Sequence, residues 1–194
     1  MVIKMIDELQ LTVQVNMSYE ELDKYLIDKG LNRINQKYQK DLFMIKSDEK
    51  IEELADFEKL SRSIIIRDIQ NEFKGFIYKK ASFDVLNATL KKTSIKVDLL
   101  DLDQGYHFLE ALGYKKFFAL TQTLVEYANA NNKICVSIIK DLGVFVEIHG
   151  EHMNYKNGST AVELKEILNN YVPNIMNNDY YVSKPLLMIR KIFK

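Results

Sequence analysis

Polar and apolar residues alternate in two stretches of the chain. Residues 8–15, ELQLTVQV, place apolar Leu and Val on one face and Glu8, Gln10, Thr12 and Gln14 on the other. Residues 144–149, VFVEIH, place Val and Ile on one face and Phe145, Glu147 and His149 on the other. A period of two predicts strands, each with one apolar and one mixed or polar face.

Four stretches have the features of helices: residues 18–30, 101–113, 159–172 and 183–193. The first begins with Ser18 and Glu21, which are spaced as a capping box. Ser159 is expected to cap the third helix, and Pro185 lies near the first turn of the last one. The first helix follows the strand at residues 8–15, and the last two follow the strand at residues 144–149.

Further apolar runs predict strands near 33–45, 61–69, 72–81, 88–100, 117–127 and 133–139. With about eight strands and about four helices in this order, the expected fold is α+β. We expect an antiparallel eight-stranded β-barrel, or tunnel, with helices packed outside. The mixed polar faces of several strands fit a barrel with a wet interior.

Composition narrows the class of protein. The 194 residues are 47% hydrophobic and 28% charged, which is typical of a soluble globular protein. Lysine plus arginine and aspartate plus glutamate number 27 each, so the chain lacks the basic excess typical of nucleic-acid binding. One cysteine, Cys135, fits a reducing compartment and is expected to be a buried small hydrophobe. We expect a single cytoplasmic domain over residues 1–194, with no nucleic acid and no membrane as partners.

Residues 134–150, ICVSIIKDLGVFVEIHG, resemble the penultimate hairpin of CYTH domains. These are the triphosphate tunnel enzymes, which include class IV adenylyl cyclases and thiamine triphosphatases. Their hairpin has an acid, a leucine-glycine turn and a strand ending Glu-x-Glu-Gly. Residues 108–127 resemble the helix, glycine and strand before that hairpin, and residues 62–69 resemble a strand with an inward arginine.

The resemblance implies a chemistry for the polar faces. Acids on the inner wall of such a tunnel hold one or two divalent metals, here Mg or Mn, and bases grip the triphosphate. His149 stands where the family has a second acid. The implied phosphate-binding residues are Arg67, Lys79 and Lys92, and the implied metal-binding residues are Glu8, Glu147 and His149. No catalytic residue is assigned.

The sequence departs from the family pattern at the implied site. Gln10 and Thr12 replace an acid and a lysine of the opening strand, and Gln122 and Leu124 replace a Lys-x-Arg pair. Ser137 replaces the acid before the turn. Glutamine keeps the size of glutamate without its charge and is a poor ligand for a hard cation. The departures indicate a changed or lost activity on a retained fold.

Three functions follow from this pattern. The leading hypothesis is a tunnel protein that binds a small phosphorylated ligand, with degraded or altered metal-dependent phosphohydrolase activity. The first alternative is an active metal-dependent triphosphatase or class IV adenylyl cyclase with a rearranged site. The second is a non-enzymatic barrel that binds a small ligand or a partner protein. A homodimer is a further expectation.

Overall fold

The computed structural model describes residues 4–84, 89–150, 155 and 157–193, and side chains over the same ranges except 4–8, 57, 79–84 and 89–94. Eight strands lie in this part of the chain: β1 (Lys4–Val15), β2 (Asn32–Lys46), β3 (Ile64–Ile69), β4 (Phe73–Asp84), β5 (Thr89–Asp98), β6 (Tyr114–Ala128), β7 (Lys133–Ile139) and β8 (Gly143–His149).

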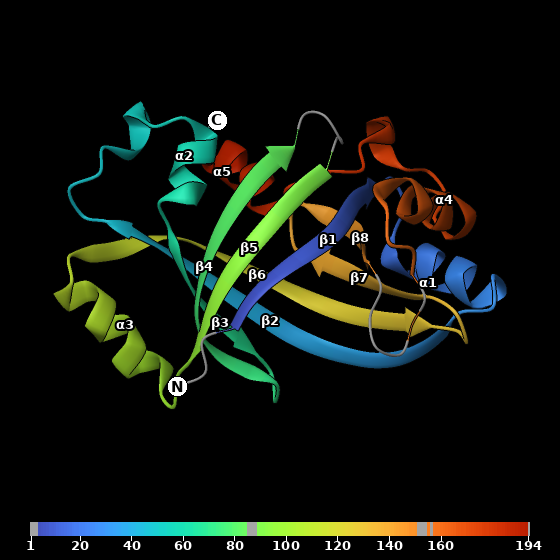
Figure 1. Cartoon of the computed structure of the whole chain (residues 1–194), viewed down its shortest axis with the longest axis horizontal. Helices are drawn as coiled ribbons and strands as arrows, with labels where there is room; N and C mark the ends of the chain where they lie inside the picture. The colour runs from blue at the N-terminus through green and yellow to red at the C-terminus, as the bar shows by residue number, and fades with distance from the viewer. Residues whose placement is uncertain (1–3, 85–88, 151–154, 156, 194) are drawn as a thin grey trace.

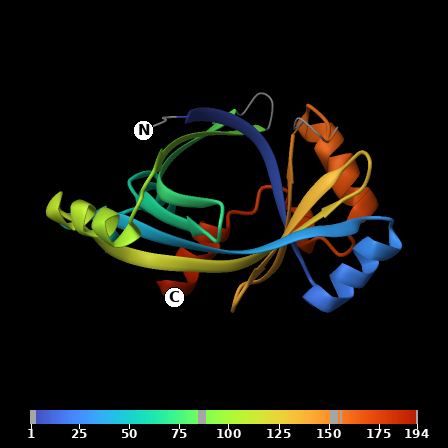
Figure 2. The same cartoon turned by 90° about the horizontal axis from the view of Figure 1, so that it is seen from below.

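The strands form a closed antiparallel barrel in the order β1-β5-β4-β3-β2-β6-β7-β8. β1 closes the ring with its two halves, because residues 4–9 pair with β5 and residues 10–15 pair with β8. Figures 1 and 2 show the long strands β2 and β6 crossing the molecule below β4, β5 and β1. The expected eight-stranded antiparallel barrel is confirmed.

Five α-helices lie in the described part of the chain: α1 (Tyr19–Asp28), α2 (Asp56–Ser61), α3 (Leu102–Ala111), α4 (Ala161–Tyr171) and α5 (Lys184–Ile192). Two short 3₁₀ turns, Ile51–Glu53 and Met176–Asn178, complete the described helical structure. Figure 1 shows α1 and α4 at one end of the barrel and α3 at the other. No helix in the described ranges combines the length and the apolar character that crossing a bilayer requires.

The helix caps agree with the sequence at one site and differ at another. The capping box of Ser18 and Glu21 is confirmed at the start of α1. The expected cap of α4 was one residue off, because Thr160 is the cap and its Oγ1 accepts from the Glu163 N–H at 3.3 Å. Ser159 instead donates its backbone N–H to the Glu163 carboxylate, at 2.7 Å.

An outer core fills the space between the barrel and two helices. Leu22 and Leu26 of α1 and Leu164 and Leu168 of α4 pack in one cluster with the apolar faces of β1 and β8. That cluster includes Leu11, Val13, Val15, Val144, Val146 and Ile148. The apolar faces predicted from the alternation are therefore the outer faces of these strands, covered by helices.

A second buried cluster, the inner core, shows which faces of the strands point into the barrel. One buried cluster joins side chains from six strands and from α5: Phe43, Ile65, Ile77, Phe118, Leu120, Ile139, Phe145 and Ile189. Residues from six different strands of a closed barrel can meet only inside it. Phe145 thus marks the inner face of β8, and Ile189 shows that α5 packs against the inner wall.

The C-terminal chain reaches the interior along β1. The Thr12 N–H donates to the Tyr180 carbonyl at 3.0 Å, and the Thr12 carbonyl accepts from the Val182 N–H at 3.0 Å. These bonds lie on the edge of β1 that β5 occupies as far as Leu9. The segment before α5 therefore lies beside the second half of β1, and Figure 2 shows this red chain within the outline of the barrel.

Candidate functional site

Five polar residues share the inner face of the barrel with the inner core. Each lies two positions along its strand from an inner-core residue, and alternate residues of a strand face the same side. The pairs are Glu147 with Phe145, Gln122 with Leu120, Ser137 with Ile139, Asp41 with Phe43, and Arg67 with Ile65. The sequence analysis singled out a polar residue on four of these strands, β3, β6, β7 and β8, but none on β2.

Lys184, the first residue of α5, joins three of these positions. Its Nζ donates to Gln122 Oε1 at 2.8 Å and to Ser137 Oγ at 3.0 Å, and it forms an ion pair with the Glu147 carboxylate. The side chains of Lys184 and Glu147 are only 10% and 12% exposed. An ammonium has three N–H donors, and the three contacts come from three neighbouring strands, β6, β7 and β8.

Sequence reasoning missed Lys184, because it assigned no site residue after His149. One local signal was present. A lysine at the start of a helix lies at the positive end of the helix dipole, which disfavours a cation there. Pro185 fixes this register, since proline is tolerated in the first turn of a helix. A lysine in that position needs acceptors from elsewhere, and the inner wall provides them.

Arg67 is the implied phosphate-binding residue that the structure describes most fully. Its Nε donates to Asp41 Oδ1 at 2.6 Å and its Nη2 donates to Asp41 Oδ2 at 2.5 Å, so the pair is bidentate. Gln39 Nε2 donates to the same carboxylate at 3.0 Å. Asp41 is buried and Arg67 nearly so, with side chains 4% and 15% exposed. The sequence analysis assigned no role to Asp41, which lies directly opposite Arg67 across β2 and β3.

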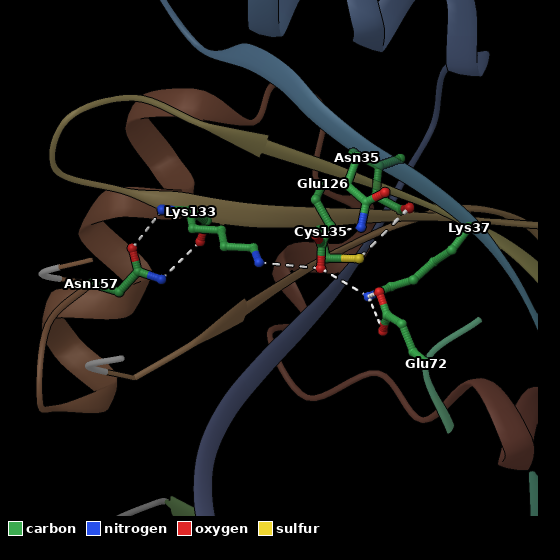
Figure 3. Close-up of polar contacts among 8 residues, drawn as sticks. Asn35, Lys37, Glu72, Glu126, Lys133, Cys135 and Asn157 are labelled. Atoms are coloured by element: carbon green, nitrogen blue, oxygen red, sulfur yellow. Dashed lines mark hydrogen bonds and ion pairs between the residues drawn. The ribbon is translucent and has the colours of Figure 1, made fainter. Parts of the chain in front are cut away.

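A second charged group lies farther along the same wall. Lys37 Nζ contacts Glu72 at 2.7 Å and Glu126 at 3.2 Å, and Lys133 Nζ contacts Glu126 at 3.2 Å. Figure 3 shows these side chains together with Cys135, and shows Asn157 holding the backbone of Lys133.

The pKa values of this group reflect burial and charge acting in opposite directions. Burial acts to raise the pKa of Glu126, but the charges of Lys133 and Lys37 and their hydrogen bonds outweigh it, so the pKa is lowered. Burial acts to lower the pKa of Lys37, but hydrogen bonds to Glu72 and Glu126 outweigh it, so the pKa is raised. Both groups are therefore held in their charged forms.

Cys135 lies between the Lys184 group and the Lys37 group. It is directly opposite Glu126 on β6 and Glu147 on β8. Burial, with a further contribution from the Glu147 charge, raises the pKa of the Cys135 thiol to about 12. A thiol with such a pKa is protonated at neutral pH and is a poor nucleophile. An unreactive thiol agrees with the expectation, but Cys135 is half-buried and lies opposite two acidic residues, so it is not the expected fully buried small hydrophobe.

The remaining implied residues are only partly described. The side chains of Glu8, Lys79 and Lys92 lie outside the described part of the chain; their backbones pair Glu8 with Lys92 and Lys79 with Ser94. His149 pairs with Gln10 of β1, and its carbonyl accepts from Asn157 Nδ2 at 2.9 Å. The implied roles of these residues stay predictions.

The described side chains do not form the set of oxygen ligands that Mg and Mn prefer. Within the described ranges, no three side chains of histidine, cysteine, aspartate or glutamate gather in a way that could hold an ion. The contacts of Lys184 Nζ are to one carboxylate, one amide oxygen and one hydroxyl, from Glu147, Gln122 and Ser137. A hard divalent cation prefers several carboxylate or carbonyl oxygens, so this set does not fit one while Lys184 is in place.

Comparisons of fold agree with the resemblance. The structure is similar to the PH1819 protein from Pyrococcus horikoshii OT3, with a TM-score of 0.69, 20% identity, and coverage of 95% of this chain and 99% of that one. It is also similar to a candidate adenylate cyclase from Vibrio parahaemolyticus, with a TM-score of 0.61, 14% identity, and coverage of 94% and 98%.

A third similar structure is a candidate adenylyl cyclase from Hippeastrum with a dominant triphosphatase activity, with a TM-score of 0.61, 10% identity, and coverage of 96% of both chains. No protein-family model and no curated protein matches the sequence. At these identities the likeness concerns the fold, and it confirms the resemblance to the CYTH tunnel fold at that level.

Proposed function

We propose that this chain binds a small phosphorylated anion on the inner wall of its barrel, without efficient metal-dependent turnover. The observation that carries the proposal is a wall that keeps basic side chains while no three metal-ligating side chains gather in its described part. Among the described bases of this wall, Arg67, Lys184 and Lys37 have side chains that are only 15%, 10% and 14% exposed. Lys96 lies directly opposite Ile77 of the inner core and shares its face.

The ligand class follows from the donors. A guanidinium can offer two parallel N–H groups to a phosphate, and ammonium groups act as additional point charges. In a partly desolvated setting such charges attract an anion more strongly than in water. Pyrophosphate, tripolyphosphate and the polyphosphate end of a nucleotide carry the needed charge. Similarity in fold to a protein with triphosphatase activity supports this choice.

The ion pairs set the expected strength. Asp41 takes two donors of Arg67, and Glu126 contacts both Lys37 and Lys133. An incoming phosphate must compete with these carboxylates for the same donors. Binding is therefore expected to be weak and to weaken further with salt, which screens the attraction.

Calorimetric titration of pyrophosphate tests the proposal. Wild type should show saturable binding that a metal chelator does not change. Arg67→Ala should weaken it by about tenfold or more, since a charge-assisted contact contributes roughly 1.5–3 kcal/mol. Arg62→Ala is the matched control, because Arg62 pairs with Glu49 on the surface and is 48% exposed.

The opposite result would favour the active-enzyme alternative. Binding that disappears in chelator but survives Arg67→Ala would mean that a metal held by the acids, among them Glu147, binds the anion, and that Arg67 does not. The expected homodimer and the single domain stay predictions. Light scattering after size-exclusion chromatography measures the first, and a single cooperative unfolding transition would support the second.

A further inference from the structure

The ammonium of Lys184 occupies the inner-wall position beside Glu147. It lies among one carboxylate, one amide oxygen and one hydroxyl from three adjacent strands. The contact lengths to Gln122 and Ser137, 2.8 and 3.0 Å, are those of hydrogen bonds and exceed the distances of Mg ligands, about 2.0–2.1 Å. The cluster is thus built around a lysine and not around an unfilled ion position.

Charge also distinguishes a cluster that holds a lysine from one that holds a divalent metal ion. Lys184 and Glu147 together are neutral. A divalent cation beside Glu147 would lie within a few ångströms of the ammonium and would meet like-charge repulsion in a site with little exposure to water. Either the lysine or the metal can occupy the cluster, but not both.

The fold holds Lys184 at this position. The chain before it is hydrogen-bonded to Thr12, which lies directly opposite Glu147 on β1. The helix after it is fixed by Ile189, which is fully buried in the inner core. An ammonium tethered on both sides has a high effective concentration at Glu147 and pays little entropy to bind, unlike an ion taken from solution.

The substitutions in the strands fit the same explanation. Gln122 stands where the resemblance expects a base, and Ser137 stands where it expects an acid. A base at position 122 would repel Lys184, whereas a glutamine offers its Oε1 to it at 2.8 Å. A second acid at position 137 would give the cluster a net negative charge and favour a divalent ion. These two neutral residues therefore suit the lysine better than the charged ones would.

We propose that Lys184 replaces the divalent cation in this tunnel, as a built-in ammonium that compensates Glu147 and keeps metals out. This deepens the proposed function and rests on it for the ligand class alone, because the occupancy of the Glu147 cluster can be measured without any phosphate. It gives a physical reason why the anion would bind without a metal. It also assigns a role to a C-terminal helix that the strand motifs leave unexplained.

Titration with Mn²⁺, followed by the loss of the free-ion signal in electron paramagnetic resonance, tests the proposal. Wild type should show no saturable site that depends on Glu147, so Glu147→Gln should leave its weak background unchanged. Lys184→Met keeps the apolar stem and removes the charge. It should gain one Mn²⁺ site at least about tenfold tighter than that background, and the double variant with Glu147→Gln should lose it.

Lys184→Arg is the matched control, since it keeps the charge and should gain no site. A wild-type Mn²⁺ site that Glu147→Gln abolishes would overturn the proposal, and this comparison needs no change at Lys184. A folded Lys184→Met variant that gains no site would also overturn it. Pyrophosphate titration of the same proteins without metal separates the two proposals, because it reports on the anion site whatever the outcome with Mn²⁺.

Discussion

Arg67 and Asp41 face each other across β3 and β2 and share two N–H···O hydrogen bonds of 2.6 and 2.5 Å. The inner wall therefore supplies its own anion to the base that the resemblance assigns to phosphate. The pair is mostly buried, so neither partner can lose the other without leaving a poorly solvated charge. If Arg67 binds an external anion as proposed, that anion competes with Asp41 for the same donors, and binding is then coupled to the stability of the barrel.

Asp41→Asn should destabilise the chain and strengthen anion binding. Removing one partner of a buried pair costs roughly 3–5 kcal/mol, because the remaining charge is uncompensated. Pyrophosphate can then take the place of the carboxylate. We expect a lower melting temperature than in wild type, and a larger rise on adding pyrophosphate, measured by calorimetry.

Glu49→Gln provides the control for that experiment. Glu49 pairs with Arg62 at 2.8 Å on the surface, where such pairs contribute at most about 1 kcal/mol. This variant should melt close to wild type and respond to pyrophosphate in the same way. Equal responses of Asp41→Asn and wild type would argue against Arg67 as an anion-binding residue.

Phosphate release from tripolyphosphate or ATP should be slow, with added Mg or Mn. Gln10, Thr12, Gln122, Leu124 and Ser137 replace charged positions of the family pattern. Metal and bases normally neutralise the charge of the transferring phosphoryl group, so their loss raises the barrier. We expect kcat well below the ordinary range of about 1–10³ s⁻¹. A value within that range, measured by phosphate detection, would refute the loss of activity and favour the enzyme alternative.

The barrel could be predicted from the sequence because its signals are local. Alternation in β1 and β8 reports which residues face the helices, and the capping box of Ser18 and Glu21 depends on four consecutive residues. The cap of α4 was misplaced by one residue because Ser159 and Thr160 are both suitable caps. The spacing to Glu163 distinguishes them, because Thr160 and Glu163 form a capping box and Ser159 has Val162 in the corresponding position.

The site could be predicted only in part, because its main contacts join distant segments. Lys184 meets Gln122 and Ser137 across 62 and 47 residues of sequence, and no local pattern encodes such a pairing. Asp41 likewise meets Arg67 through the register of β2 and β3. The strand motifs identified Glu147 and Arg67, but the partners that neutralise them follow from how the barrel closes and where its C-terminal chain runs.

The pair of Lys37 and Glu126 should stabilise the chain over a defined pH range. The pKa of Glu126 is lowered from 4.5, so its contribution is complete above that value and is lost as pH falls below it. The pKa of Lys37 is raised from 10.5, so its contribution is complete below that value and is lost as pH rises above it.

The difference in unfolding free energy between wild type and the double variant Lys37→Met/Glu126→Gln should therefore be constant between about pH 5 and pH 10 and shrink on both sides. Urea unfolding at a series of pH values measures it. Lys50→Met/Glu53→Gln changes an exposed pair of the same kind and should give a small difference. A difference for the inner pair that grows toward acid pH would contradict the assignment of charges.

Cys135 offers a reporter for the state of the Glu147 cluster. Its thiol lies opposite Glu147, and its pKa is raised from 9.0 to about 12 by burial first and by the Glu147 charge next, while Lys184 acts to lower it. At pH 8, a rise of the pKa from 9.0 to about 12 lowers the fraction of thiolate about a thousandfold. Alkylation by iodoacetamide at pH 8 should be at least about a hundredfold slower in the folded chain than in urea, since the thiolate is the nucleophile.

The same rate should respond to each charge with a known sign. Glu147→Gln removes a negative neighbour and should speed alkylation relative to wild type, and Lys184→Met removes a positive neighbour and should slow it. Cys135→Ser should show no reaction, and all cysteine-containing variants should react equally in urea, which excludes differences in the reagent. If Lys184→Met alkylated faster while keeping the wild-type melting temperature, Lys184 would be shielding the thiol from solvent, and its charge would not be what Cys135 senses.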